Sequence, residues 1–450
     1  SEQNHFMSHV QDWVAQMPHL WAGLWEQAVR PLDVSDDRLA EVVRRLSLSE
    51  VWEPLEQQIT QRMVRVYELP SERVRLDTTT AKVYGGNDLS VLFQRGHSKD
   101  HRPDLRQLKV MLAALDPLGV LVGADVVSGN AADDGLYVPM IARLRSSLPP
   151  KGLLYIGDCK MGALATRAYV SQTGNSYLMP LAQVGSLPEQ LEKWVDDAVR
   201  GKVRLQPVWD VDGKTRLGEA YEHARRLSAE TETGTVAWNE RVLIVRSMVY
   251  AKAAVHSLQQ GLAQAQVELR ALTPPRGRGQ RQFTEETSLQ AAVDAILERY
   301  AVNGLLTVKL QRETESRRMR AYGKLPARQE ERHRYLVQVK ENRARLRALE
   351  PRLGWRVYAT NAPARQLPLG QAVLTYRDEW LVERNCARLK GRTLSLAPLW
   401  VRRDDHAGSN RHRLVETHHR PFHHVVALAV AVQPLFLGPA VLAQEAVVGV

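Results

Sequence analysis

The chain has 450 residues and ordinary globular composition, 44% hydrophobic and 25% charged, and this length favours two or three domains. Its two cysteines are too few for a disulfide framework or a cysteine-built zinc site, which fits a reducing compartment. The net charge of +11 and pI near 9.7 predict a polyanionic partner, nucleic acid first, with surface solubility as the alternative interpretation.

Residues 1–70 are predicted to form a helical module without strands. Tryptophans interrupt any apolar run near the start, so we expect no signal peptide and a cytoplasmic, nucleoid-associated protein. Helical spacing covers residues 39–46, after a capping sequence at residues 35–37, and a second helix is predicted over residues 49–64. Five of its arginines either contact phosphates or belong to solvated helix faces: Arg38, Arg44, Arg45, Arg62 and Arg65.

The next stretch, residues 73–160, has the pattern of a sheet, with short apolar runs separated by turn sequences. The runs cover residues 74–76, 89–93, 108–115 and 120–127. We interpret them as an antiparallel meander that leads into a helix at residues 142–147 and a buried strand at residues 153–157. Three strands, a helix and another strand, with acids on the first and fourth strands, is the order of a ribonuclease H-like α/β fold.

Asp77 and Asp158 are those two acids. Asp77 is placed near the end of a β-branched strand, residues 73–80, and Asp158 directly follows the buried strand. Carboxylates at the carboxyl ends of strands face the crevice where open α/β sheets bind ligands, so the pair suggests a metal site. The alternative for each is the capping of a loop or helix start.

A polar loop over residues 97–104 is rich in cations. We interpret Lys99, His101 and Arg102 as phosphate contacts, with ordinary loop solvation as the alternative. Pro103 argues against a helix in this loop, and therefore against a metal site built on its histidines.

After a strand at residues 177–181, residues 185–330 do not fit this small fold and are predicted to be an insertion domain. In and after it we expect a long helix over residues 251–272 and strands over residues 203–211, 241–245, 305–308, 335–339 and 355–360. Pro and Gly break the chain after the helix. The arginines there, including Arg276 and Arg278, either grip a DNA backbone or belong to a flexible linker.

A helical pattern then covers residues 370–391. Along it Tyr376, Glu379, Glu383 and Lys390 are spaced so that they share nearly one face of a helix. Other charges crowd the same helix, so a solvated surface helix is the alternative.

Together, three segments resemble the DDE transposases of bacterial insertion sequences. The segments are residues 76–80, 155–161 and 376–390, and the resemblance covers residues 36–406. The chain looks like the branch that has an insertion between the second and third acids and a Tyr-Arg-Glu-Lys helix signature. The resemblance implies a ribonuclease H-like mixed sheet that is interrupted by the insertion domain and preceded by the helical module.

Position by position, the resemblance implies that Asp77, Asp158 and Glu383 are the catalytic, metal-binding triad. Tyr376 and Lys390 would be the DNA-contacting Tyr and Lys of the signature. The implied cofactor is Mg²⁺, with Mn²⁺ as a substitute, because three carboxylates supply the hard oxygen ligands these ions prefer. Two such ions about 4 Å apart activate the attacking oxygen and stabilise the leaving oxygen.

One position departs from the signature, because Glu379 stands where Arg is expected. The phosphate of the flanking strand would not be gripped there in the usual way. Glu379 also competes with Glu383 as the third ligand, and the surrounding sequence Trp-Leu-Val-Glu-Arg favours Glu383.

The resemblance implies cleavage and joining of double-stranded DNA at the terminal inverted repeats of the element. After cleavage, the released end attacks either the opposite strand, which forms a hairpin, or target DNA. We expect a homodimer on DNA, no membrane association, and end recognition mainly by residues 1–70. A cleavage-deficient derivative that only binds ends and a nuclease indifferent to end sequence are the alternatives. A glycosidase that uses two of the acids would have no reason for a basic surface.

The predicted parts of the chain are residues 1–70, 71–184, 185–330, 331–406 and 407–450. The last part is atypical: residues 406–424 hold six of the 14 histidines, and residues 425–443 are almost wholly apolar. Because the resemblance ends at His406, we interpret the tail as the product of a frameshift or truncated reading frame. A zinc site and a membrane anchor are the alternatives.

Overall fold

The computed structural model describes residues 9–84, 90–97, 102–231, 234–275, 283–319 and 328–390. The predictions for Lys99, His101, Arg276, Arg278 and the tail at residues 407–450 lie outside these residues. No helix in the described part of the chain is long and apolar enough to cross a membrane.

Helices alone fill the described residues before the first strand, as predicted. They are α1 (Val10–Gln16), α2 (Pro18–Trp25), η2 (Pro31–Val34), α3 (Asp36–Leu46) and α4 (Ser49–Val66). Val14, Trp21 and Val34 form a small core of their own, and the rings of Trp13 and Trp21 meet edge to face at 4.8 Å.

The fourth helix, α4, packs into the sheet rather than into that small core. Trp52 and Leu55 belong to the same apolar cluster as strand residues, and the hydroxyl of Thr60 donates to the carbonyl of Val122 at 3.2 Å. The predicted boundary at residue 70 therefore separates α4 from the sheet on which it packs.

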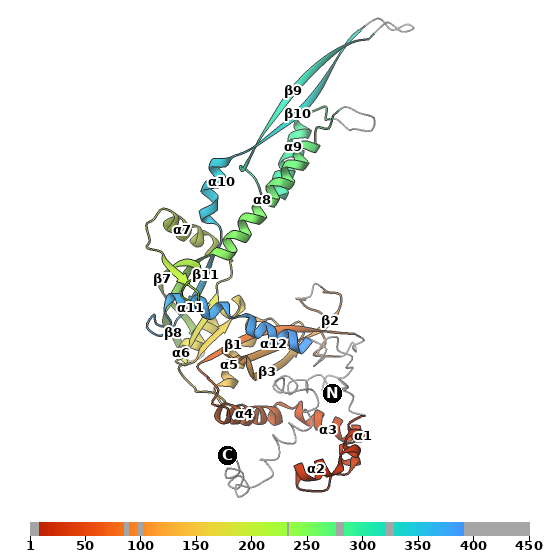
Figure 1. Cartoon of the computed structure of the whole chain (residues 1–450), viewed down its shortest axis with the longest axis vertical. Helices are drawn as coiled ribbons and strands as arrows, with labels where there is room; N and C mark the ends of the chain where they lie inside the picture. Colours follow the sequence, from red (N-terminus) through yellow and green to blue (C-terminus); the bar gives the residue numbers. More distant parts are fainter. Residues whose placement is uncertain are drawn as a thin grey trace. The chain divides into compact units, whose positions relative to one another are not determined.

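Nine strands form one mixed sheet in the order β3-β2-β1-β4-β5-β11-β8-β7-β6 (Figure 1). Their bounds are β1 (Arg73–Val83), β2 (Arg106–Leu115), β3 (Val120–Ser128), β4 (Leu154–Gly157), β5 (Ser176–Pro180), β6 (Gln206–Trp209), β7 (Arg216–Thr231), β8 (Gly234–Ser247) and β11 (Trp355–Thr360). β1 pairs antiparallel with β2, and β2 with β3, whereas β4 is parallel to both β1 and β5. The mixed α/β architecture is therefore confirmed.

Both faces of β2 are covered, which explains its nearly continuous apolar sequence. Leu108, Val110 and Leu112 pack with α4 and with α12 (Trp380–Lys390). Met111 and Ala113 point the other way, toward α5 (Tyr137–Leu144) and α6 (Leu164–Gln172). Because side chains alternate along a strand, each residue's position decides which helix it meets.

The predicted strand at residues 89–93 is wrong in its described part, residues 90–93. There the backbone turns, and the N–H of Phe93 donates to the hydroxyl of Ser90 at 2.8 Å. Phe93 is fully buried in the apolar cluster that also holds Trp52 and Leu55 of α4, so its apolar signal comes from a core contact made by a loop.

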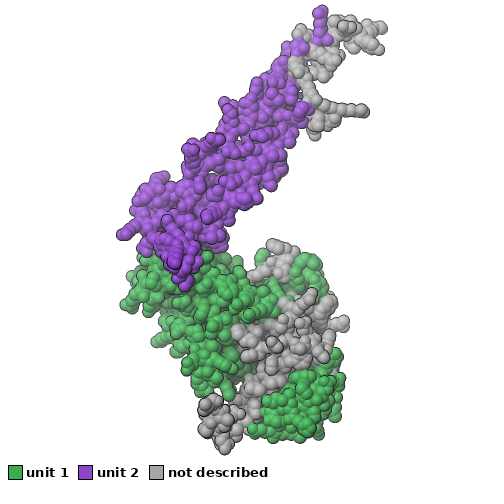
Figure 2. Space-filling model, in the orientation of Figure 1, with its two compact units in different colours: residues 1–184, 222–243, 358–450 green, residues 185–221, 244–357 purple. Residues whose placement is uncertain are grey.

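The chain divides into two compact units (Figure 2). One consists of residues 1–184, 222–243 and 358–450, and the other of residues 185–221 and 244–357. The segment 222–243 lies inside the predicted insertion but belongs to the first unit. Strand β7, which begins before this segment and continues into it, was not predicted, because its side chains are mostly polar and few of them are buried.

The second unit contains long helices and a two-stranded ribbon (Figure 1). Its remaining elements are α7 (Leu187–Val199), α8 (Met248–Ala271), α9 (Glu286–Arg299), β9 (Leu306–Met319), β10 (Arg328–Glu341), α10 (Arg343–Leu349) and η5 (Glu350–Arg352). The helix predicted over residues 251–272 is confirmed as α8. Leu262 and Leu269 of α8, Val293 and Ile296 of α9, and Leu306 of β9 form its core.

Candidate functional site

The parallel pairing of β1 with β4 brings the two predicted strand acids to adjacent positions. Leu76 of β1 is paired with Gly157, the last residue of β4, and the residue that follows each of them in the chain is the acid, Asp77 or Asp158. Neighbouring strands lie about 4.8 Å apart, so the two side chains begin close together. Asp77 is in the middle of β1, not near its end as predicted, because the strand continues to Val83.

Two hydrogen bonds hold one oxygen of Asp158. Its Oδ1 accepts from the backbone N–H of Lys160 at 2.8 Å, which caps the short turn η4 (Cys159–Gly162). The same oxygen accepts from the hydroxyl of Tyr137 at 2.6 Å. The capping role that the sequence left as the alternative is therefore present, and it uses Oδ1.

Tyr137 is fully buried at the start of α5, behind the end of β4. Burial and the neighbouring Asp158 both raise the pKa of its hydroxyl, which therefore stays protonated as a donor. Sequence reasoning missed this residue, because nothing in the local pattern distinguishes its hydroxyl from that of any other core tyrosine.

Helix α12 brings Glu383 over β1. Leu389 at its far end enters the core with Leu108, and the side-chain amide of Asn385 donates to the carbonyl of Gly119 at 2.8 Å. The thiol of Cys386 lies 3.8 Å from Oδ2 of Asp77. Glu383 precedes Cys386 by three residues, is in the first turn of α12, and is exposed.

The single helix predicted over residues 370–391 is wrong. α11 (Leu369–Arg377) ends before α12 begins, and Glu379 lies in the turn between them. In a continuous helix the N–H of Glu379 would bond the carbonyl of Thr375. That carbonyl instead accepts from Arg75 at 2.6 Å, and the Glu379 N–H bonds Tyr376 at 3.1 Å.

Glu379 is surrounded by like charge. Burial is the main cause that raises the pKa of its carboxyl, and Asp77, Glu383 and Asp158 raise it further, while a hydrogen bond with Tyr376 lowers it. Asp77, Glu383 and Asp158 are thus each within electrostatic reach of Glu379. A divalent cation would relieve this repulsion.

Their donor chemistry suits a hard cation such as Mg²⁺, which prefers carboxylate oxygens. Within the described residues, however, no group of three or more His, Cys, Asp or Glu side chains is placed to hold a metal ion. The residue types therefore suit a hard cation, but the arrangement of the described side chains does not by itself form a site of three ligands.

Other predicted contacts have different surroundings. Tyr376 is buried, with its ring 4.8 Å from that of Tyr358 and its hydroxyl bonded to Glu379, so it faces protein rather than a DNA-accessible surface. Arg102 is exposed and forms an ion pair with Asp104 at 2.7 Å. Lys390 is at the end of α12 and is partly exposed.

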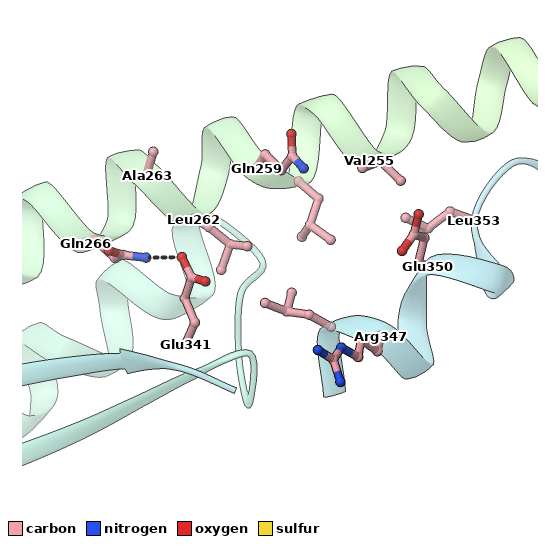
Figure 3. A pocket seen from close by; sticks show the side chains of 11 residues that line it. Val255, Gln259, Leu262, Ala263, Gln266, Glu341, Arg347, Glu350 and Leu353 are labelled. Atoms are coloured by element: carbon pink, nitrogen blue, oxygen red, sulfur yellow. Dashed lines mark hydrogen bonds between the residues drawn. The ribbon is translucent and has the colours of Figure 1, made fainter. Parts of the chain in front are cut away.

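A pocket of about 420 Å³ lies in the second unit, between α8 and the segment that contains α10 (Figure 3). Leu258 and Leu262 line it from α8, and Gln266 donates to Glu341 at 2.9 Å at one side. No residue predicted as a site from the sequence lines this pocket.

No model of a known protein family matches the chain, and no curated protein matches it.

Proposed function

We propose that the chain is a metal-dependent DNA strand-cleaving and strand-joining enzyme, a DDE transposase that acts at the ends of an insertion sequence. The observation that carries this proposal is the pairing of Leu76 with Gly157, which makes Asp77 and Asp158 neighbours, together with α12 above β1. Glu383 is then the exposed third acid.

The strand order supports the finer fold that the resemblance implies. β1, β2 and β3 form an antiparallel meander, α5 follows, and β4 then pairs parallel with β1. Acids follow the same order, on the first strand and after the fourth. A ribonuclease H-like core is therefore the fold we propose for this half of the sheet.

In this proposal Asp77, Asp158 and Glu383 hold Mg²⁺ or Mn²⁺. The ions would supply activation of the attacking oxygen and stabilisation of the leaving oxygen. The residues of the chain position the donors: the hydrogen bonds to Asp158 fix its carboxylate, and Asn385 anchors the helix that carries Glu383.

Cations of the N-terminal helices support a DNA partner. Of their five arginines, Arg38, Arg44 and Arg45 form ion pairs with acids nearby in sequence. Arg62 and Arg65 of α4 are exposed and form no ion pair within the described residues. They are the ones we assign to phosphates of the terminal repeats or target DNA, bound by a homodimer.

This assignment predicts a change in salt dependence. The double variant Arg62→Gln/Arg65→Gln should reduce the slope of log affinity against log salt by about 2, because each phosphate contact contributes roughly 0.9. Arg44→Gln, whose guanidinium already pairs with Glu41, is the matched control. An unchanged slope in the double variant would remove α4 from the DNA interface.

The second candidate is an end-binding derivative that no longer cleaves. Glu379 at the expected Arg position favours it, as does the absence, in the described part of the chain, of three acids already gathered around one ion. In that case the acids would contribute to folding alone, and adding a divalent metal would not lead to cleavage of DNA.

Cleavage of labelled DNA that carries the element's ends separates the two. We expect nicking that needs Mg²⁺ or Mn²⁺ and that falls by at least about 10³-fold in Asp77→Asn, Asp158→Asn and Glu383→Gln, with end binding retained. Asp378→Asn changes an exposed acid beside Glu379 and is the matched control. Wild-type binding without metal-dependent nicking would favour the derivative, and equal nicking of DNA without the ends would indicate a simple nuclease.

A further inference from the structure

The two oxygens of the Asp158 carboxylate differ in the hydrogen bonds that they accept. Both of its hydrogen bonds, from the Tyr137 hydroxyl and the Lys160 N–H, end on Oδ1. Within the described residues no hydrogen bond ends on Oδ2. A carboxylate held through one oxygen cannot rotate freely, so its second oxygen keeps a defined direction.

Gly157 leaves space for the ring of Tyr137, whose hydroxyl holds Oδ1 of Asp158. A Cβ on Gly157 would lie 3.2 Å from Cε1 of Tyr137 and 2.8 Å from the sulfur of Met161. Any side chain at this position would therefore displace the ring or the methionine. Tyr137 and Met161 are both fully buried, in the cluster that also holds Tyr155.

We infer that Tyr137 is a positioning residue for metal binding, which fixes Asp158 through Oδ1 and leaves Oδ2 as the oxygen that binds the cation. The inference rests on the proposed function, because it assigns a cation to this carboxylate. A partner that orients a metal ligand is worth roughly 10- to 100-fold in metal affinity or activity.

The test replaces the hydroxyl and keeps the ring. In the full chain, Tyr137→Phe should weaken Mn²⁺ binding about tenfold or more, measured by electron paramagnetic resonance of free Mn²⁺ during titration. The metal concentration for half-maximal cleavage should rise by the same factor, and saturating metal should restore most of the rate. A purely structural role would instead lower the rate at every metal concentration.

Tyr155→Phe is the matched control. Its hydroxyl is also buried in the same cluster, on β4, and has no hydrogen-bond partner within the described residues. We expect its metal affinity to equal that of the wild type. A similar loss in both variants would mean that core packing, not the bond to Asp158, is responsible.

The outcomes also separate this inference from the proposed function. If the wild type binds Mn²⁺, Asp158→Asn abolishes binding and Tyr137→Phe binds like the wild type, the positioning role is wrong and the proposed function stands. If the wild type binds no Mn²⁺, or if Asp158→Asn binds it unchanged, both ideas fail together.

Discussion

Arg75 of β1 donates at 2.6 Å to the carbonyl oxygen of Thr375, the carbonyl to which the N–H of Glu379 would bond in a continuous helix. Helix α11 stops two residues later, and Glu379 is left in the turn. Arg75 also contacts Asp116 at 3.2 Å, with both side chains almost wholly buried. The guanidinium of Arg75 therefore joins three elements: β1, the turn between β2 and β3, and α11, which is the helix before the third acid.

Arg75→Met should destabilise the protein by about 3–5 kcal/mol, because it leaves the buried Asp116 with only the more distant Arg73. Chemical denaturation measures the change. Adding Asp116→Asn removes the uncompensated charge, so the double variant should recover part of the loss. If the single and double variants are equally unstable, the ion pair is not the cause.

Glu240 is the centre of a second buried network. It accepts from Arg167 at 2.9 Å, from Arg225 at 2.6 Å and from the hydroxyl of Tyr177 at 2.6 Å, and its side chain has no exposed surface. Glu240→Gln should cost about 3–5 kcal/mol of unfolding free energy, because Glu240 is fully buried and two partly buried guanidinium groups lose their counter-charge.

The matched control is Glu222→Gln. Glu222 pairs with Arg241 but is about a third exposed, at 35%, so its loss should cost about 1 kcal/mol or less. Equal effects of the two substitutions in thermal or urea unfolding would contradict the view that burial decides the cost.

Glu56 should make stability fall as pH rises. Burial raises the pKa of its carboxyl from 4.5 to about 6, against the lowering effect of Arg143. Between those values the folded state binds the proton that the unfolded state has lost, so the free energy of unfolding decreases by about 2 kcal/mol across pH 4.5 to 6.

Urea unfolding at several pH values measures this slope. In Glu56→Gln the contribution should vanish, since the amide does not titrate, although the hydrogen bond from the N–H of Ala124 at 3.0 Å can remain. The prediction is wrong if the variant and the wild type change by the same amount over this pH window.

Gly157→Ala should disturb the site through Tyr137 and Met161, the buried side chains that pack against Gly157. The added methyl group would lie 2.8 Å from the sulfur of Met161, and such overpacking costs about 1–3 kcal/mol. Metal-dependent cleavage should fall as well, because the Tyr137 ring must shift. Gly135→Ala meets no atom within 4 Å and is the control, so comparable losses in both would point to a general intolerance of alanine.

Whether an element could be predicted from the sequence depends on whether it buries a regular apolar pattern. Strands β2, β3, β5 and β11 and helix α8 agree with the predicted ranges, because each buries a regular apolar pattern that can be read locally. β7 was not predicted because its polar side chains show no such pattern. Residues 90–93 were wrongly predicted to be a strand because Phe93, which is buried in the core, belongs to a loop.

The sequence by itself determined the candidate acids Asp77, Asp158 and Glu383, since residue type and place after a strand or on a helix are local properties. Only the tertiary structure decided that Leu76 faces Gly157 and that one oxygen of Asp158 is held by Tyr137. Strand register and buried side-chain partners join residues far apart in the chain, and such pairings depend on how whole elements pack, which no local pattern encodes.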